Sequence, residues 1–294
     1  MSSPGSFNAS VTAETLAQFA AAVKPEMADE QIDLLGCALL MARTEYPGLD
    51  AGVYERKLEE LARRVAARVS RAHAPTHDHI QTIAALNHVL FEEEKFQGNR
   101  ADYYNARNSF VNDVLERKLG IPITLALVYM EIARRIGFPL SGVGMPGHFL
   151  LKHYDVHGEG ILINAFERGS ILTPADCQRL LDEIYSGNIS LQPQFLLSVT
   201  RRQWLNRMLN NLKTVYISQR NFKKALPIAE MILAIYPRSA EDIKQRAVLR
   251  YHNQQTRGAL ADFNTYLEIA PEASDAAEIR ETVLSIRRSL ASMN

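Results

Sequence analysis

The sequence contains little cysteine. Cys37 and Cys177 are its only thiols in 294 residues, whereas a disulfide framework needs several pairs at regular spacing. The sequence also lacks neighbouring cysteine pairs and a His-Glu-x-x-His motif, the patterns typical of zinc sites. Two isolated thiols fit a reducing compartment, so we expect a cytoplasmic protein.

An excess of charge of either sign is also missing. Lysine plus arginine and aspartate plus glutamate both number 33, which gives a net charge of zero. The composition therefore gives no support to nucleic-acid or anionic-membrane binding. The apolar runs are too short to span a bilayer, and Met1–Ser10 lacks the basic start and apolar stretch of a secretory signal. The sequence predicts neither a nucleic-acid nor a membrane partner.

Histidines are grouped in two places, but neither group has the pattern of a metal site. His77-Asp78-His79 lies in a predicted loop with no obvious third ligand. His148 and His153 are followed by a predicted hairpin tip, His157-Gly158-Glu159-Gly160. No glycine-rich loop precedes a helix where a phosphate could bind. We therefore expect no metal and no cofactor.

The stretch 120–152 is the most informative part of the chain. Pro122 suits the first turn of a helix, where its missing N–H has no partner to lose. The apolar residues that follow are too dense for a surface helix, which predicts a buried helix that ends at Gly137 and Pro139. A strand is predicted directly after His148. A buried helix that leads into a strand starting at a histidine is a candidate for chemistry.

Three further motifs accompany this stretch: Glu45-Tyr46-Pro47-Gly48-Leu49-Asp50, Asn108-Ser109-Phe110-Val111-Asn112-Asp113-Val114-Leu115 and Pro146-Gly147-His148-Phe149-Leu150. Together they resemble the transglutaminase-like superfamily, in the version found in the SirB-type bacterial regulatory proteins. The resemblance covers nearly the whole chain after residue 12. It implies a regulatory or accessory role in bacteria, without identifying a partner.

The resemblance also implies where a catalytic triad would lie. In the superfamily a nucleophilic cysteine opens the core helix, a histidine lies on the next strand and an aspartate on the strand after it. These positions hold Pro122, His148 and Asn164 here. Proline offers neither a nucleophile nor an N–H for an oxyanion, whereas asparagine can still orient a histidine. The implied site is degenerate, and no residue is assigned as catalytic.

Two other side chains are candidates for a replacement nucleophile. Thr124 lies in the first helical turn, where a capping hydroxyl is the ordinary role. Cys177 lies near a later helix, and a free cysteine is usually a small buried apolar residue. For His148 we weigh two roles equally, a core histidine bonded to Asn164 and a binding residue.

Helical spacing of apolar residues covers most of the remaining chain. The predicted helices are 12–23, 29–42, 49–71, 80–96, 108–118 and 174–185, and the predicted strands are 141–145, 149–154 and 160–164. Two charged runs fall on these helices: Arg63, Arg64, Arg68 and Arg71 on one, and Glu92–Glu94 at the end of another. The arginine row, with glutamates one turn back, is predicted to be a solvated, ion-paired face rather than a basic patch. The glutamate run is predicted to be a solvated helix end rather than a metal or catalytic site.

The last hundred residues contain an internal repeat. Residues 224–237 resemble 258–271, and the prolines that end these segments, at 237 and 271, are 34 residues apart. This is the period of the tetratricopeptide repeat. The second copy departs from the pattern, because Arg246 and Arg250 occupy places where apolar or aromatic residues are usual. Residues 274–291 are predicted to form a capping helix. Two repeats and a cap are marginal alone, so we expect them to pack on the core.

These observations predict an α+β fold that is mostly helical. They divide the chain into a flexible tail at 1–11, an N-terminal helical region at 12–98, a transglutaminase-like core with a small antiparallel sheet at 99–191, and tetratricopeptide-like helices at 192–294.

Two functions from different classes fit this division. The first is a non-enzymatic regulatory or scaffold protein, a pseudoenzyme that binds a protein or peptide partner. The second is a hydrolase or transferase that acts on peptide-like amides through His148 and an unrecognised nucleophile. Pro122 at the position of the cysteine favours the first.

Overall fold

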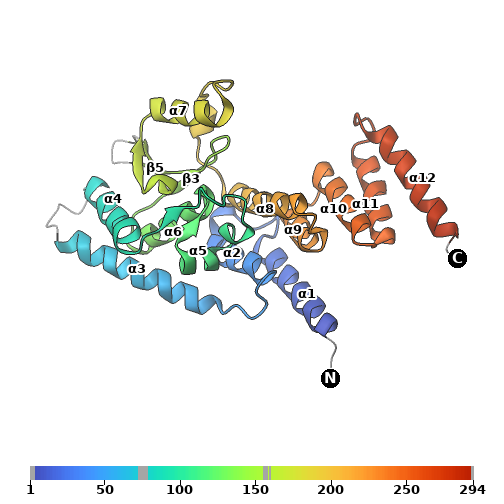
Figure 1. The fold of residues 1–294 in the computed structure, drawn as a ribbon, viewed down its shortest axis with the longest axis horizontal. Coiled ribbons are helices and arrows are strands. Elements are labelled where there is room, and N and C mark those ends of the chain that lie inside the picture. Colours follow the sequence, from blue (N-terminus) through green and yellow to red (C-terminus); the bar gives the residue numbers. More distant parts are fainter. Residues whose placement is uncertain (1–3, 72–78, 155–157, 159, 293–294) are drawn as a thin grey trace. The chain divides into compact units, whose positions relative to one another are not determined.

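The computed structural model describes residues 4–71, 79–154, 158 and 160–292. The fold is mostly helical, at 66%, with a small antiparallel sheet, which confirms the predicted class (Figure 1). The chain forms two compact units. The first unit comprises 1–32, 43–47 and 209–294, and the second comprises 33–42 and 48–208.

The predicted boundaries at 98/99 and 191/192 do not coincide with these units. α3 (Ala51–Arg71) and α4 (His79–Asn87) contact α6 (Pro122–Arg135) within the second unit. Their apolar faces are buried there, so they do not form a separate N-terminal region. The predicted tail is also shorter than expected, because α1 (Pro4–Ala22) begins at Pro4.

α6 is the central helix of the second unit, as its continuous apolar sequence predicts. Eleven of its residues are buried, among them Leu127 and Tyr129 with no exposed surface. Its C-terminal arginines are neutralised by Glu131, whose carboxylate lies 3.0 Å from Arg134 and 2.5 Å from Arg135. This ion pairing lets a mostly apolar helix end near solvent without an unpaired buried charge.

The sheet of the second unit has the strand order β3 (Ser141–Val143), β4 (Leu150–Tyr154), β5 (Gly160–Asn164), β6 (Ser170–Leu172), all antiparallel. β6 was not predicted, because three residues are too few to show an alternation of polar and apolar side chains. Both faces of β4 are buried at its start, since the neighbouring residues Leu150 and Leu151 have no exposed surface. α6 contacts β4, and Leu150 packs in an apolar cluster with residues of α7 (Pro174–Tyr185) (Figure 1).

Several other elements of the second unit are short. A parallel pair of two-residue strands, β1 (Gln97–Gly98) and β2 (Leu119–Gly120), precedes α6. α2 (Leu34–Arg43) and α5 (Val111–Arg117) are shorter than the helices predicted at 29–42 and 108–118. The helix predicted at 80–96 changes after α4 into a π-helical segment, His88–Glu93.

The first unit contains the repeated helices. They are α9 (Phe222–Ile235), α10 (Ala240–His252), α11 (Thr256–Ile269) and α12 (Ala276–Ser292), preceded by α8 (Arg201–Ser218), whose last turns belong to this unit. Successive helices from α9 to α12 contact each other. Ala225 and Ala259 have no exposed surface, which allows the close helix approach expected of small residues at these places.

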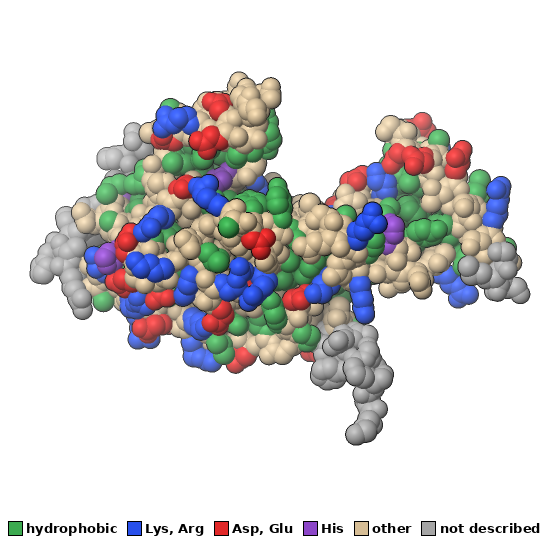
Figure 2. Space-filling model, viewed as in Figure 1, with side chains coloured by type: hydrophobic (Ala, Val, Ile, Leu, Met, Phe, Trp, Pro, Cys, Tyr) green, Lys and Arg blue, Asp and Glu red, His purple; other side chains and the backbone are tan. Residues whose placement is uncertain are grey.

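The surface agrees with the balanced composition. On the face shown in Figure 2, lysine and arginine side chains alternate with aspartate and glutamate rather than forming a field of one sign. Among the helices of the described residues, none combines the length and apolar character needed to cross a bilayer.

Candidate functional site

The first turn of α6 holds the residue predicted at the nucleophile position. Pro122 is the first helical residue and is buried. Two residues later, the Thr124 hydroxyl accepts a hydrogen bond from the Ile121 N–H at 3.2 Å and donates one to the Asn108 carbonyl at 2.8 Å. Thr124 has no exposed surface. Its hydroxyl therefore caps the helix, the ordinary role weighed for it from the sequence.

His148 and Asn164 are brought together by the pairing of β4 with β5. His148 lies just before β4 and Asn164 ends β5, and the His148 Nε2 atom is 3.0 Å from Asn164 Oδ1. The same oxygen accepts the Phe166 N–H at 3.1 Å. Because a main-chain N–H only donates, this atom is the amide oxygen, and His148 Nε2 must carry the proton. His148 Nδ1 is then the basic atom, and it has no partner among the described residues.

The surroundings keep this imidazole neutral. Burial lowers the pKa of His148 below its ordinary value of 6.5, and the hydrogen bond to Asn164 opposes this effect. The positive charges of Arg207 and Arg100 lower the pKa further. Only 7% of His148 is exposed. Both roles weighed for His148 stay open, since it is a mostly buried histidine bonded to Asn164 that keeps an unused acceptor atom.

One aromatic ring links this pair to the start of α6. Gly120, two residues before Pro122, pairs with Gly98 across β1 and β2. A Cβ atom on Gly98 would lie 2.4 Å from the Phe166 ring, so the ring packs directly on that glycine. The same ring meets His148 edge-on, with 5.9 Å between centroids. The histidine and asparagine of the predicted triad therefore lie in one neighbourhood with the strand pair that leads into Pro122.

Two other residues at this site were not predicted from the sequence. Arg207 of α8 donates from Nη2 to the Met145 carbonyl at 2.9 Å and to the His148 carbonyl at 2.7 Å. Tyr103, from the loop before α5, meets the Phe166 ring edge-on at 6.3 Å. Arg207 lies 59 residues after His148, in a segment that the sequence assigned to the repeats, and no local pattern marks either residue.

The two thiols are buried and make no hydrogen bond to His148. Cys177 has no exposed surface and packs with Leu150 and Leu181 in the apolar cluster beneath α7, and this burial raises its pKa. Burial also raises the pKa of Cys37 to about 12. Neither thiol is hydrogen-bonded to His148 in the structure. Both thiols are therefore structural and lack thiolate character at neutral pH.

His153 and His79 take part in packing. His153 Nδ1 lies 2.8 Å from the Pro139 carbonyl, and its Nε2 lies 2.7 Å from His79 Nδ1. Its ring stacks on Phe138 with 4.1 Å between centroids. The other residues of the two histidine groups, His77, Asp78 and His157, lie outside the described residues, as does Glu159 of the predicted hairpin tip. Over the described ranges, no three His, Cys, Asp or Glu side chains are grouped to hold a metal.

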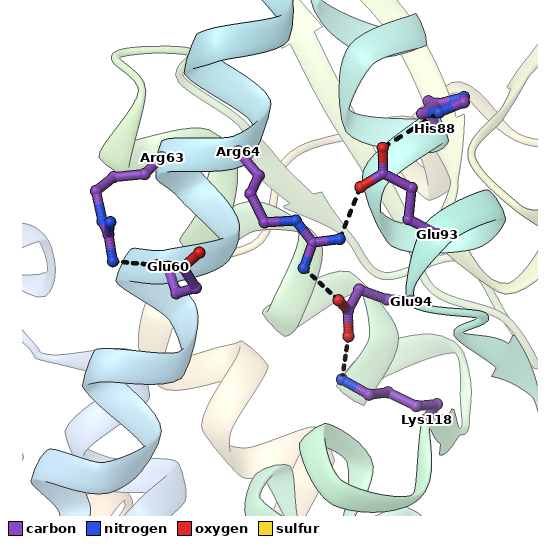
Figure 3. Close-up of polar contacts among 7 residues, drawn as sticks. All are labelled: Glu60, Arg63, Arg64, His88, Glu93, Glu94 and Lys118. Carbon is purple, nitrogen blue, oxygen red and sulfur yellow. Dashed lines mark hydrogen bonds and ion pairs between the residues drawn. The ribbon is translucent and has the colours of Figure 1, made fainter.

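Members of both charged runs form ion pairs (Figure 3). The pair of Arg63 with Glu60 of its own helix was predicted, whereas the pairing of the glutamate run was not. Arg64 of α3 lies between the carboxylates of Glu93 and Glu94, with Nη2 2.7 Å from Glu93. Lys118 Nζ is 2.7 Å from the other oxygen of Glu94, and His88 Nε2 is 3.2 Å from Glu93. Glu93 of the π-helical segment and Glu94 directly after it therefore link α3 to the end of α5 through ion pairs, and both carboxylates are paired.

Comparison with known proteins covers both parts of the chain. Residues 53–210, which contain the His148 site, match the transglutaminase-like superfamily. Residues 212–283 match the tetratricopeptide repeat, which confirms that prediction.

Individual relatives extend over most of the chain. It is 32% identical over 259 residues to a UPF0162 protein of Xylella fastidiosa (strain 9a5c), covering 86% of this chain and 89% of the relative. A UPF0162 protein of Vibrio cholerae is 29% identical over 198 residues, covering 67% of this chain and 73% of that protein. F-box only protein 21 of Homo sapiens is 35% identical over 184 residues, covering 58% of this chain and 28% of that protein.

Proposed function

Since this chain belongs to the transglutaminase-like superfamily and to the UPF0162 proteins within it, we propose that it is an interaction protein that retains the framework of the superfamily without its nucleophile. In this proposal it is a cytoplasmic regulator or accessory protein of the SirB type. It binds a protein or peptide partner and carries out no acyl transfer.

The occupation of the nucleophile position is the observation that carries the proposal. Acyl transfer by such a site needs a thiolate or hydroxyl, a base that activates it and a group that orients the base. The base and its orienting group are present as His148 and Asn164, 3.0 Å apart. At the position that the resemblance gives to the nucleophile, the chain has a buried proline, Pro122. Thr124, the nearest hydroxyl, is engaged by the Asn108 carbonyl.

The repeats support the binding part of the proposal. Tetratricopeptide helices form surfaces on which other proteins commonly bind. Several large apolar side chains of these helices are exposed, among them Val248, Tyr251 and Leu284 at 41%, 52% and 50%. Exposed apolar side chains on a repeat surface favour protein contact over a purely structural role.

The second candidate is a hydrolase or transferase that acts on peptide-like amides. The observation that favours it is the unused Nδ1 atom of His148, because a buried neutral imidazole held by an asparagine is a competent base. This candidate requires a nucleophile that approaches Nδ1 when substrate binds.

Labelling with electrophilic probes distinguishes the two candidates. The folded full-length chain is treated with a chloroacetamide probe for thiols and a fluorophosphonate probe for hydroxyls, and labelled residues are found by mass spectrometry. We expect no residue whose labelling depends on His148, and labelling of Cys37 and Cys177 by the thiol probe only after unfolding. Labelling of Thr124 or Cys177 that disappears in His148→Ala would establish the enzyme instead.

Capture of partners tests the binding part separately. The full-length chain is immobilised and exposed to native lysate, with an exposed-residue variant, Tyr251→Glu and Leu284→Glu, as the matched control. We expect at least one protein that the wild-type chain enriches and the control loses. If both chains capture the same proteins, the exposed residues of the repeats do not bind the partner, and that part of the proposal is wrong.

A further inference from the structure

Arg207 has hydrogen-bond donors that the chain leaves unused. Its Nη2 group makes two bonds to main-chain carbonyls, those of Met145 and His148. A guanidinium has five N–H donors, and the remaining three, on Nε and Nη1, have no partner among the described residues. Arg207 also forms none of the ion pairs found within the described ranges. A half-buried guanidinium without a carboxylate is unusual, because desolvation of a charge normally requires a counter-charge.

Within the described part of the chain, the neighbours of Arg207 supply further donors but no unpaired carboxylate. The titratable groups that act on its charge are the hydroxyl-bearing Tyr103 and Tyr185. Tyr103 is 36% exposed, and its hydroxyl has no partner within the described part of the chain. The nearby carboxylate of Glu167 is already paired with Arg100. The cluster therefore offers N–H and O–H donors and positive charge toward solvent.

The backbone is shaped to bring this guanidinium close to His148. Gly144 lies beside it, and a Cβ atom there would be 3.3 Å from Arg207 Nη1 and 2.9 Å from Val199. The guanidinium also lies over the Phe149 ring, with 5.5 Å from Cζ to the ring centroid. Two carbonyl bonds and this stacking fix its orientation, so the unused donors are pre-organised. Binding to fixed donors costs less ordering entropy than binding to a mobile arginine.

From this arrangement we propose that the surface formed by Arg207, Tyr103 and His148 binds a carboxylate group of a peptide or protein partner. A carboxylate is the anion that peptides carry, and arginine is the side chain best suited to hold it through charge-assisted hydrogen bonds. The carboxylate oxygens accept from the unused Arg207 donors and from the Tyr103 hydroxyl. This inference rests on the proposed function, because it takes the partner to occupy the degenerate site.

Two sources of such a carboxylate exist in a polypeptide, its C-terminus and an internal Asp or Glu side chain. Three N-acetylated tetrapeptides separate them: one with a free C-terminal carboxylate, the same peptide as a C-terminal amide, and an amide with one internal glutamate. Each is titrated into the full-length chain labelled with ¹³C in histidine. The readout is the Cε1–H signal of His148, which is assigned by its absence in His148→Gln.

We expect at least one carboxylate peptide to shift this signal with an affinity at least tenfold higher than that of the neutral amide. Arg207→Gln is expected to abolish that preference, whereas Arg202→Gln, which removes an arginine from the same helix, is expected to change it less than twofold. Tyr103→Phe is expected to weaken the preference about two- to fivefold. It provides a second test that does not depend on Arg207→Gln folding.

Three results would overturn the inference. Equal binding of the neutral and charged peptides to the wild-type chain shows that the site binds peptides without reading a carboxylate, which leaves the proposed function standing. A preference that persists in folded Arg207→Gln and in Tyr103→Phe shows that other residues read the charge. No shift of His148 by any of the three peptides removes both the inference and the degenerate site as the place where a partner binds.

Discussion

Two regions of this molecule depart from the pattern of their families, and they do so in opposite ways. In the repeats, Arg246 and Arg250 replace apolar residues, and both bond Asp262 of the next helix, at 2.7 Å and 2.8 Å. Asp262 is 4% exposed, and Arg250 has a second carboxylate in Glu230 at 3.3 Å, so two carboxylates balance the two arginines. At the start of α6, Pro122 occupies the position that the resemblance gives to a nucleophile, and we propose that no other described side chain takes over that role.

We propose that the substitutions in the repeat are structural and that the one at position 122 is functional. The arginines in the repeat keep the helices paired, because a carboxylate on α11 satisfies them in place of apolar packing. Pro122 also preserves its helix, since proline suits the first helical position, but it supplies no thiol. In this proposal the arginines in the repeat are a structural substitution, balanced by carboxylates, whereas Pro122 is a functional one that removes a reaction.

The largest effect should come from the apolar core of the second unit. Leu127→Ala removes a fully buried side chain, and we expect it to lower the free energy of unfolding by roughly 2–5 kcal/mol. Leu284→Ala, at a half-exposed position of α12, is the matched control and should change it by less than about 0.5 kcal/mol. Urea unfolding followed by circular dichroism measures both. Similar losses for the two variants would contradict the buried position of α6.

The next effect tests whether Asp262 balances the two arginines. Asp262→Ala leaves Arg246 without its carboxylate and leaves Arg250 with Glu230 alone, at 3.3 Å. Because the arginines are 23% and 21% exposed, we expect a loss of about 3 kcal/mol, the lower end for a broken buried pair. Glu268→Ala, at an exposed position of the same helix, is the control. An Asp262→Ala variant as stable as its control would show that the arginines need no partner, and the contrast with Pro122 would fail.

A smaller effect is expected at the helix cap beside Pro122. Thr124→Val keeps the shape of the side chain but leaves the Ile121 N–H and the Asn108 carbonyl without a partner. We expect a loss of about 1–2 kcal/mol, typical of an unsatisfied buried group. Thr282→Val, which removes an exposed hydroxyl bonded to the Glu278 carbonyl, should cost less. A Thr124→Val chain as stable as the wild type would show that the Thr124 hydroxyl is not needed for stability, and this would strengthen the enzyme candidate.

The pH dependence of stability carries the smallest of these effects. Burial holds the pKa of His148 below 6.5 in the folded chain, so between that lowered value and 6.5 the unfolded chain binds more protons. The free energy of unfolding therefore falls as the pH is lowered through this window. His148→Gln can still donate to Asn164 but does not titrate, so its stability should fall less steeply below pH 6.5. Identical pH profiles from urea unfolding would contradict the buried, neutral state of His148.

Much of the fold was predictable from local patterns. α7 was predicted at its observed bounds, because Thr173 caps it, with its hydroxyl accepting from the Asp176 N–H, and Pro174 begins it. The 34-residue period predicted the tetratricopeptide repeat, which the comparison confirms. β6 and the pair β1–β2 were missed, because strands of two or three residues have no alternation to read. The π-helical segment after α4 was missed because its apolar spacing resembles that of an α-helix.

The site was predictable only where the residues lie on one short stretch. His148 and Asn164 are 16 residues apart and pair through a simple hairpin, so their contact follows from the resemblance. Arg207 reaches them from a helix 59 residues later, and such a contact has no local signature. The Asp262 partner of Arg246 was missed for the same reason, since a helix-to-helix bond cannot be read from the spacing within either helix.

The central claim is that position 122 still lies where a nucleophile would act with His148. It is tested most directly by placing the thiol there and measuring its pKa, from thiolate absorbance at 240 nm against pH, in Pro122→Cys and in Pro122→Cys with His148→Gln. The account predicts a thiol pKa lower by about one unit or more when His148 is present, because Nδ1 of the neutral imidazole accepts the thiol proton and the imidazolium so formed stabilises the thiolate. Equal thiol pKa values in the two folded variants would show that position 122 does not face His148, and would contradict the account.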